Sequence, residues 1–139
     1  MPGYSGTPLP KKLGIKAGFR VQLKNAPPEV LAEVREELAE CSILERGTDF
    51  DFAMVFTKSA EHLSAEFPRM AKRLARAGML WVSWPKKSSG VSTDIDEHTV
   101  REIGLAAGLV DVKVCAVTEV WSGLKFVRRL RDRKNKNRD

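Results

Sequence analysis

The side chains best spaced for chemistry lie in a polar loop at residues 84–93, between an apolar run and a predicted helix. Lys86 and Lys87 are followed there by several hydroxyl side chains and a glycine. Ammonium groups beside a helix N-terminus attract anions, because that end of a helix presents unpaired N–H groups and a positive dipole. The loop therefore favours a phosphate, a carboxylate or a nucleic-acid backbone as ligand. The alternative is a solvated loop in which both lysines only cover apolar surface.

Familiar catalytic and metal-binding patterns are missing from the sequence. His62 and His98 lack the spacing to another His or Cys that a metal site needs. Ser83 and Lys86 match a Ser-x-x-Lys pattern, but Pro85 and the preceding strand exclude the helical turn that would align them. We therefore predict no catalytic residue, no metal and no cofactor.

Most of the net positive charge lies in residues 128–139. The chain is 42% hydrophobic and 30% charged, a composition that excludes disordered and membrane-embedded classes. Its net charge is +6, and residues 128–139 hold seven basic side chains against two acidic ones. Such a tail fits contact with nucleic acid or an acidic protein, although it lacks aromatic side chains for base stacking; a disordered, solubilising segment is the alternative. The predicted contact residues are Arg128, Arg129, Arg131, Arg133, Lys134, Lys136 and Arg138.

Hydrophobic periodicity predicts strands that alternate with helices. The first helix begins at Pro28, and the third is capped by Asp94. The second is capped by Ser59 and runs to Gly78, and Pro68 predicts either a kink in it or a division into two short helices. The predicted strands are 19–23, 41–44, 52–56, 79–84, 110–116 and a last one that carries Leu124 and Phe126, after a turn at 121–123. Within 110–116, the valines at 110, 112 and 114 and Ala116 are predicted to share one face.

This order predicts an α/β, three-layer Rossmann-like fold with a mostly parallel sheet and a C-terminal antiparallel hairpin. We expect an extended arm at 1–18, a single domain at 19–128 and a basic, disordered tail at 129–139. Ligands of such sheets bind beyond the carboxyl ends of the strands. This edge gives the candidate ligand-binding residues, which are Asn25, Lys58, Trp84, Lys86, Lys87, Ser88, Ser89 and Thr93.

The second half of the sequence resembles the class I S-adenosylmethionine-dependent methyltransferases. Residues 50–55 (Phe-Asp-Phe-Ala-Met-Val) are similar to that family's FDxVx strand, and residues 73–83 are similar to its xLxPGGxLxxS segment. The family's glycine-rich turn, which lets backbone approach the cofactor, is replaced by Asn25-Ala26-Pro27-Pro28. We therefore expect cofactor binding to be lost. Glu45 lies about 20 residues later, where this type of fold reads ribose hydroxyls; a solvated carboxylate is the alternative.

Nearly the whole sequence is also similar to an uncharacterised bacterial family, a domain of unknown function. The shared segments are residues 4–15 (Tyr-Ser-Gly-Thr-Pro-Leu-Pro-Lys-Lys-Leu-Gly-Ile), the Trp-Pro-Lys-Lys loop at 84–87 and residues 120–129 (Val-Trp-Ser-Gly-Leu-Lys-Phe-Val-Arg-Arg). This resemblance implies a family identity and supplies no activity.

The sequence thus predicts a non-catalytic binding or regulatory module that engages an anionic small molecule or acidic partner at the carboxyl edge, assisted by the tail. The alternative is a small, degenerate methyltransferase-like enzyme acting on an anionic substrate at the same edge. Its residues would include Lys86, Lys87, Ser88 and Asp94. No apolar run is long enough to cross a bilayer, so no membrane contact is expected. Two cysteines in apolar runs indicate a reduced, cytoplasmic protein, and the oligomeric state stays open.

Overall fold

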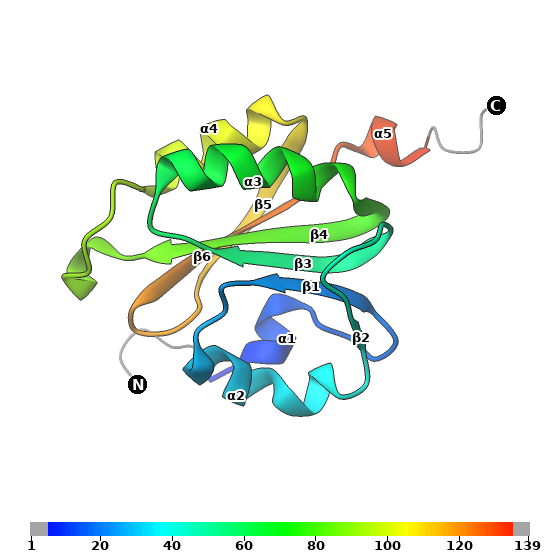
Figure 1. Ribbon diagram of the computed structural model, residues 1–139, viewed down its shortest axis with the longest axis horizontal. Helices are drawn as coiled ribbons and strands as arrows, with labels where there is room; N and C mark the ends of the chain where they lie inside the picture. Colours follow the sequence, from blue (N-terminus) through cyan, green and yellow to red (C-terminus); the bar gives the residue numbers. More distant parts are fainter. Residues whose placement is uncertain (1–5, 135–139) are drawn as a thin grey trace.

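A computed structural model describes residues 6–134 as one six-stranded sheet between two layers of helices (Figure 1). The strand order is β2-β1-β3-β4-β6-β5; β1 to β4 are parallel, and β6 is antiparallel to both β4 and β5. The predicted fold class is confirmed. The strands are β1 (Arg20–Lys24), β2 (Ser42–Ile43), β3 (Phe50–Phe56), β4 (Leu74–Pro85), β5 (Leu109–Ala116) and β6 (Trp121–Arg128). The helices are α1 (Leu9–Leu13), α2 (Pro28–Leu38), α3 (Ala60–Lys72), the 3-10 turn η1 (Lys87–Ser89), α4 (Glu97–Ala106) and α5 (Leu130–Lys134).

Helices α3 and α4 cover one face of the sheet and bury one hydrophobic core (Figure 1). The periodic residues Leu63, Phe67 and Met70 of α3 pack there against strand side chains such as Phe126. The rings of Phe67 and Phe126 meet edge to face with centroids 5.1 Å apart. Pro68 lies exposed inside α3, which continues through it as one helix, so the two-helix alternative is wrong.

Helices α1 and α2 cover the opposite face and bury a second core. Residues 9–13 form a helix where an extended arm was expected, because Leu9 and Leu13 are buried against the sheet. The buried Trp81 of β4 donates a hydrogen bond from Nε1 to the Leu13 carbonyl. The N-terminal segment, as far as it is described, is therefore a structural layer of the domain.

Two predicted element boundaries are wrong. Helix α3 ends at Lys72, and β4 begins at Leu74, whereas the pattern predicted helix up to Gly78. Gly78 is buried inside β4, and a Cβ there would overlap the Phe50 carbonyl oxygen. The residues Trp121 to Gly123 belong to β6, and the turn precedes them at 117–120.

Asp94 caps a different helix from the one predicted. Its Oδ1 accepts a 2.8 Å hydrogen bond from the N–H of Ala60 at the start of α3. The N-cap of α4 is Asp96, whose Oδ1 accepts from the Thr99 N–H at 2.9 Å. Asp94 thus ties the 86–94 loop to α3.

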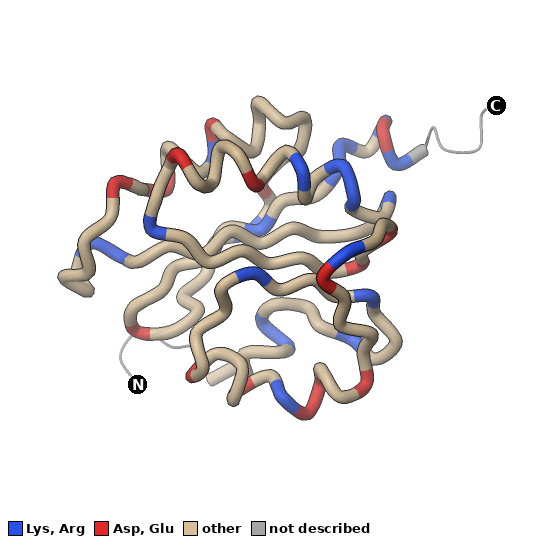
Figure 2. The backbone as a smooth tube through the Cα atoms, viewed as in Figure 1, with Lys and Arg blue, Asp and Glu red and all other residues tan. Residues whose placement is uncertain are grey.

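The C-terminal segment begins at the pole opposite the carboxyl ends of the parallel strands. Arg128 donates to the carbonyls of Ala71 and Leu74 at the end of α3, and Arg76 donates to the carbonyl of Arg133. Basic residues gather around α5 at this pole (Figure 2). Residues 130–134 are helical, which differs from the disordered tail expected, and this described part lies too far along the sheet to assist the loop at Lys86. Lys136 and Arg138 lie outside the described residues.

No helix within 6–134 is long and apolar enough to cross a membrane. The described part of the chain also contains no group of three or more His, Cys, Asp or Glu side chains placed to hold a metal ion.

Candidate functional site

Two hollows lie side by side at the carboxyl edge of the sheet, on either side of Asn25. The first, here called the His62 pocket, has a volume of about 450 Å³. The second, the Glu45 pocket, has a volume of about 360 Å³. The His62 pocket is lined by Asn25, Phe56, Thr57, Lys58, Ser59, His62 and Trp121, and the Glu45 pocket by Gln22, Leu23, Lys24, Asn25, Glu45 and Arg46.

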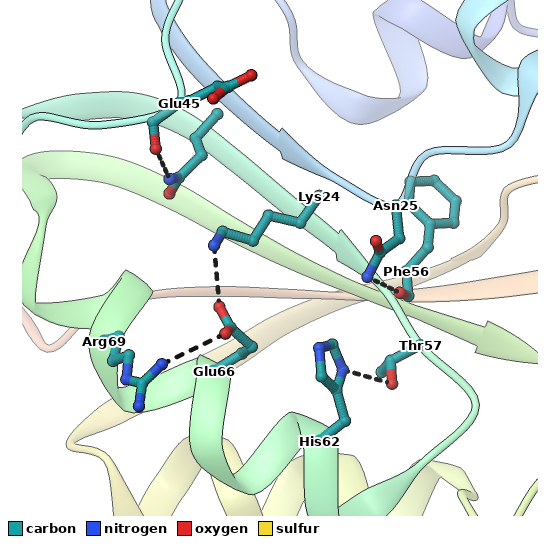
Figure 3. A network of polar contacts seen from close by, with 9 residues as sticks. Lys24, Asn25, Glu45, Phe56, Thr57, His62, Glu66 and Arg69 are labelled. Atoms are coloured by element: carbon teal, nitrogen blue, oxygen red, sulfur yellow. Dashed lines mark hydrogen bonds and ion pairs between the residues drawn. The ribbon is translucent and has the colours of Figure 1, made fainter.

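Asn25 separates the two hollows. Its φ of 62° places it in the left-handed region that asparagine tolerates better than most residues other than glycine. Its Nδ2 donates a 3.3 Å hydrogen bond to the carbonyl of Phe56, so the side chain bridges the ends of β1 and β3 (Figure 3). The turn therefore has the left-handed backbone conformation that usually calls for glycine, but the Asn25 side chain lies across it.

A hydrogen-bonded pair, Thr57 and His62, forms the floor of the His62 pocket (Figure 3). His62 is held on α3 by its own N–H, which donates to the Oγ of the N-cap Ser59 at 3.1 Å. The Thr57 hydroxyl, 2.9 Å from the ring Nδ1, also lies 3.3 Å from the Ser59 carbonyl, to which it can donate. The same hydroxyl accepts a 3.2 Å hydrogen bond from the Ser59 N–H, and its proton can point either to the Ser59 carbonyl or to Nδ1. In the first arrangement the ring donates from Nδ1, and a lone pair is left on Nε2.

The Nε2 atom of His62 has no hydrogen-bond partner among residues 6–134. Trp121 and Phe56 form an apolar wall of the same pocket, with ring centroids 5.3 Å apart at 80°. Lys58 is exposed at the rim, and its carbonyl accepts a 2.7 Å hydrogen bond from the Thr93 hydroxyl. The pocket thus combines an available imidazole nitrogen, one cation and an aromatic wall.

The Glu45 pocket contains a buried amide with a free acceptor. Gln22 is only 1% exposed. Its Nε2 donates to the carbonyl of Glu45 at 3.0 Å, and its Oε1 has no hydrogen-bond partner among the residues that the structure describes. Buried amide oxygens usually have one. The Glu45 carboxylate is exposed at the mouth of the same hollow.

An ion-pair network links β1 to α3 between the two hollows (Figure 3). The Nζ of Lys24 lies 3.1 Å from Glu66 Oε1, and an arginine of α3, Arg69, lies 3.6 Å from Glu66 Oε2. The hydrogen bond from Lys24 lowers the pKa of the Glu66 carboxyl, against the opposing effect of burial. This network fixes the position of α3, and hence that of His62, relative to β1.

Two of the eight predicted site residues, Asn25 and Lys58, line the two hollows described above. Trp84 is buried in the core beneath α3 and α4, so it is not available for stacking on a ligand. The Lys86 N–H donates to the Val120 carbonyl, the Ser89 hydroxyl donates to the Lys86 carbonyl, and the Thr93 hydroxyl serves Lys58. Lys87 and Ser88 are exposed on η1. Most polar groups of the predicted loop are thus used in hydrogen bonds that fold the loop or attach it to its neighbours. Ligand binding by this loop remains a prediction.

Most residues that line the two hollows were not predicted as site residues, among them Gln22, Thr57, His62 and Arg46. His62 could have been identified from its position, because it is the third residue after the cap Ser59, in the first turn beyond a buried strand. A lone histidine carries no spacing signal of its own. The buried, unpaired oxygen of Gln22 has no signature in the sequence.

Comparison with solved structures identifies the architecture. A magnesium protoporphyrin IX methyltransferase from Synechocystis, solved with bound SAH, has a TM-score of 0.58 at 13% identity, covering 87% of this chain and 78% of its own. This chain has a methyltransferase-like fold. A TehB-like methyltransferase from Corynebacterium glutamicum gives a TM-score of 0.56 at 9% identity, covering 91% and 90% of the two chains. A methyltransferase from Aquifex aeolicus gives 0.53 at 18%, covering 84% and 85%.

No protein-family model matches the sequence, and no curated protein matches it. Membership of the bacterial family of unknown function therefore stays a prediction. At these identities the methyltransferase-like structures establish the fold alone.

S-adenosylmethionine, which this fold implies as a cofactor, does not fit the Asn25 turn. The Asn25 side chain crosses the turn to the Phe56 carbonyl, where a cofactor would need bare backbone. Pro27 is the N-cap of α2 and Pro28 is its first residue, and neither has an N–H that could donate to a ligand. The next residue of the first turn is the acidic Glu29. The left-handed backbone of Asn25 shows that the missing glycine is not the obstacle; the side chain and the two prolines are.

Proposed function

We propose that this chain is a small enzyme of methyltransferase-like fold that acts on a small anionic substrate in the His62 pocket, with His62 as general base. The observation that carries the proposal is the Thr57–His62 hydrogen bond of 2.9 Å. It holds the ring in place, and the proposal assigns the ring proton to Nδ1, so that the lone pair of Nε2 can accept a proton.

Recognition of an anion rests on Lys58 at the rim. The ammonium group attracts a carboxylate or phosphate, while the Trp121 and Phe56 rings cover an apolar part of the same molecule. Asn25 contributes its side-chain oxygen on the wall between the hollows, since its nitrogen is held by Phe56. No step of this chemistry uses S-adenosylmethionine, because the cofactor does not fit the turn.

The test combines binding with proton chemistry. Phosphate, pyrophosphate, small carboxylates, adenosine and S-adenosylhomocysteine are screened by thermal shift, and each compound that binds is followed by NMR for conversion. We expect an anionic compound to raise the melting temperature and to shift the His62 ring signals. His62→Asn should retain binding and abolish conversion, and Lys58→Met should weaken binding. His98→Asn, on the exposed surface of α4, is the matched control.

If none of the anions perturbs a histidine ring signal, the proposal is overturned. Stabilisation by S-adenosylhomocysteine would show that the turn accepts the cofactor after all.

The second candidate is a non-catalytic binding module that uses the same pocket. It is favoured by the bridging Asn25 side chain and the paired prolines, which remove the cofactor chemistry of the fold. Binding of an anion that depends on Lys58, without conversion of any bound compound and without effect of His62→Asn, would favour this candidate.

A further inference from the structure

A cluster of lysines lies on the face of the sheet that α1 covers, along the pair of strands β5 and β6. Lys113 of β5 and Lys125 of β6 are directly opposite each other in the strand pair. The Nζ of Lys113 donates to the carbonyl of Lys12 at 3.0 Å, and the Nζ of Lys12 donates to the carbonyl of Ala116 at 2.8 Å. The lysine cluster is defined as Lys12, Lys16, Lys113 and Lys125.

A bulge in β5 creates this arrangement. Asp111 pairs with Phe126, and the next pair along is Lys113 with Lys125, so Val112 is the extra residue. In a regular strand Lys113 would share the face of Asp111, which binds Arg101 of α4. The bulge instead turns Lys113 to the face of Lys125. Bulges commonly redirect a side chain in this way. The predicted common face of the valines at 110, 112 and 114 is wrong for the same reason.

Like charges directly across a strand pair are destabilising. Lys16, Lys113 and Lys125 form no ion pair with a carboxylate within residues 6–134. Burial lowers the pKa of Lys125, and the positive charges of Lys113 and Lys16 lower it further. The fold thus places and retains three ammonium groups together, without a described counter-ion.

We propose that the lysine cluster is a binding site for phosphate groups, either of a free polyphosphate or of a nucleic-acid backbone. Several ammonium groups on one face suit a ligand with at least two negative charges and many acceptor oxygens. Lysine acts in such sites as a point charge, which does not require a fixed fork geometry. The site shares no residue with the His62 pocket and does not involve the α5 arginines at the opposite pole.

The experiment measures binding of pyrophosphate and of a short single-stranded oligonucleotide to the whole chain by calorimetry at low and moderate salt. Lys113→Met and Lys125→Met should each weaken binding about tenfold or more, the effect of removing one charged hydrogen bond. Affinity should fall as salt is raised. Lys72→Met, on the exposed end of α3, is the matched lysine control, and Lys58→Met is the control for the His62 pocket.

Response to pyrophosphate alone would identify a free polyphosphate as the source, and response to both probes would identify a nucleic-acid backbone. The proposal is overturned if neither probe binds, or if Lys113→Met and Lys125→Met bind as tightly as the unaltered chain. Folding of each variant is checked by its melting temperature in phosphate-free buffer. There, Lys125→Met should be no less stable than the unaltered chain, because a repulsion between like charges has been removed.

Discussion

The indole nitrogen of Trp81 lies 2.9 Å from the backbone carbonyl of Leu13, a residue 68 positions away in the chain. Trp81 is completely buried, so this bond satisfies the one polar atom of a large core side chain. Leu13 itself is 1% exposed and packs in the same core. The bond therefore joins α1 to the centre of the sheet and makes the N-terminal segment part of the folded domain.

Trp81→Phe should destabilise the protein by about 2–4 kcal/mol, since it leaves the Leu13 carbonyl unpaired and creates a cavity. The measurement is urea unfolding followed by circular dichroism. Trp121→Phe is the matched control, because the Trp121 indole lies at a pocket wall and makes no hydrogen bond among the described residues. An equal loss in both variants would contradict a role for the bond to Leu13.

Gly104→Ala should destabilise the protein by about 1–3 kcal/mol or more, the cost typical of overpacking a core. A Cβ at this position of α4 would overlap the ring of Phe126. Phe126 is fully buried against Phe67 and cannot move aside without opening the core. Leu105→Ala, one residue on and 40% exposed, should change stability by only about 0.5 kcal/mol. Similar melting temperatures for both variants would show that α4 can shift freely.

Glu66→Gln should make the free energy of unfolding depend less on pH at acidic pH. Because Lys24 lowers the Glu66 pKa below its ordinary value of 4.5, the ionised carboxylate stabilises the fold above that value. This contribution is lost as the pH falls through the lowered pKa. For a partly exposed pair we expect about 0.2–1 kcal/mol at pH 7, measured by urea unfolding from pH 7 to pH 2. Glu36→Gln, exposed on α2, is the control and should leave the profile unchanged.

Thr57→Val should change the tautomer of His62 without unfolding the protein. In the proposed arrangement the hydroxyl accepts from the Nδ1–H and so holds the ring proton there, and valine keeps the shape of threonine without the hydroxyl. Nitrogen NMR of the imidazole should show Nε2 as the unprotonated nitrogen in the unaltered chain and a mixture in the variant. Identical ring signals in both proteins would contradict the assigned proton position.

The buried strands and the periodic faces of the helices were predictable from sequence, because hydrophobic spacing responds directly to burial. The run from Phe52 to Phe56 is apolar at each position, and it forms a strand covered on both faces. Choices between two equivalent local signals were not predictable. Asp94 and Asp96 are both good caps two residues apart, and only the position of Ala60 in space decides which helix each one serves.

Of the predicted site residues, Asn25 and Lys58 line the two hollows described above, and the lysines and hydroxyls of the loop do not. Lysines and hydroxyls in a loop suggest binding by composition, yet the Ser89 and Thr93 hydroxyls are used to fold the loop itself. His62 and Gln22 owe their possible role in binding or catalysis to the folded structure. His62 is hydrogen-bonded to Thr57 at the end of a strand, and Gln22 has a buried side-chain oxygen without a partner among the described residues. The bulge at Val112 likewise depends on strand register, which alternation alone does not reveal.

Because Arg128 and α5 are anchored at the end of α3, the described chain leaves the domain at the pole farthest from the His62 pocket. An affinity tag or fluorophore attached beyond Lys134 would therefore stand clear of that pocket. Surface immobilisation through this end should present the carboxyl edge to the bulk solution, which makes it the preferred handle for ligand screening.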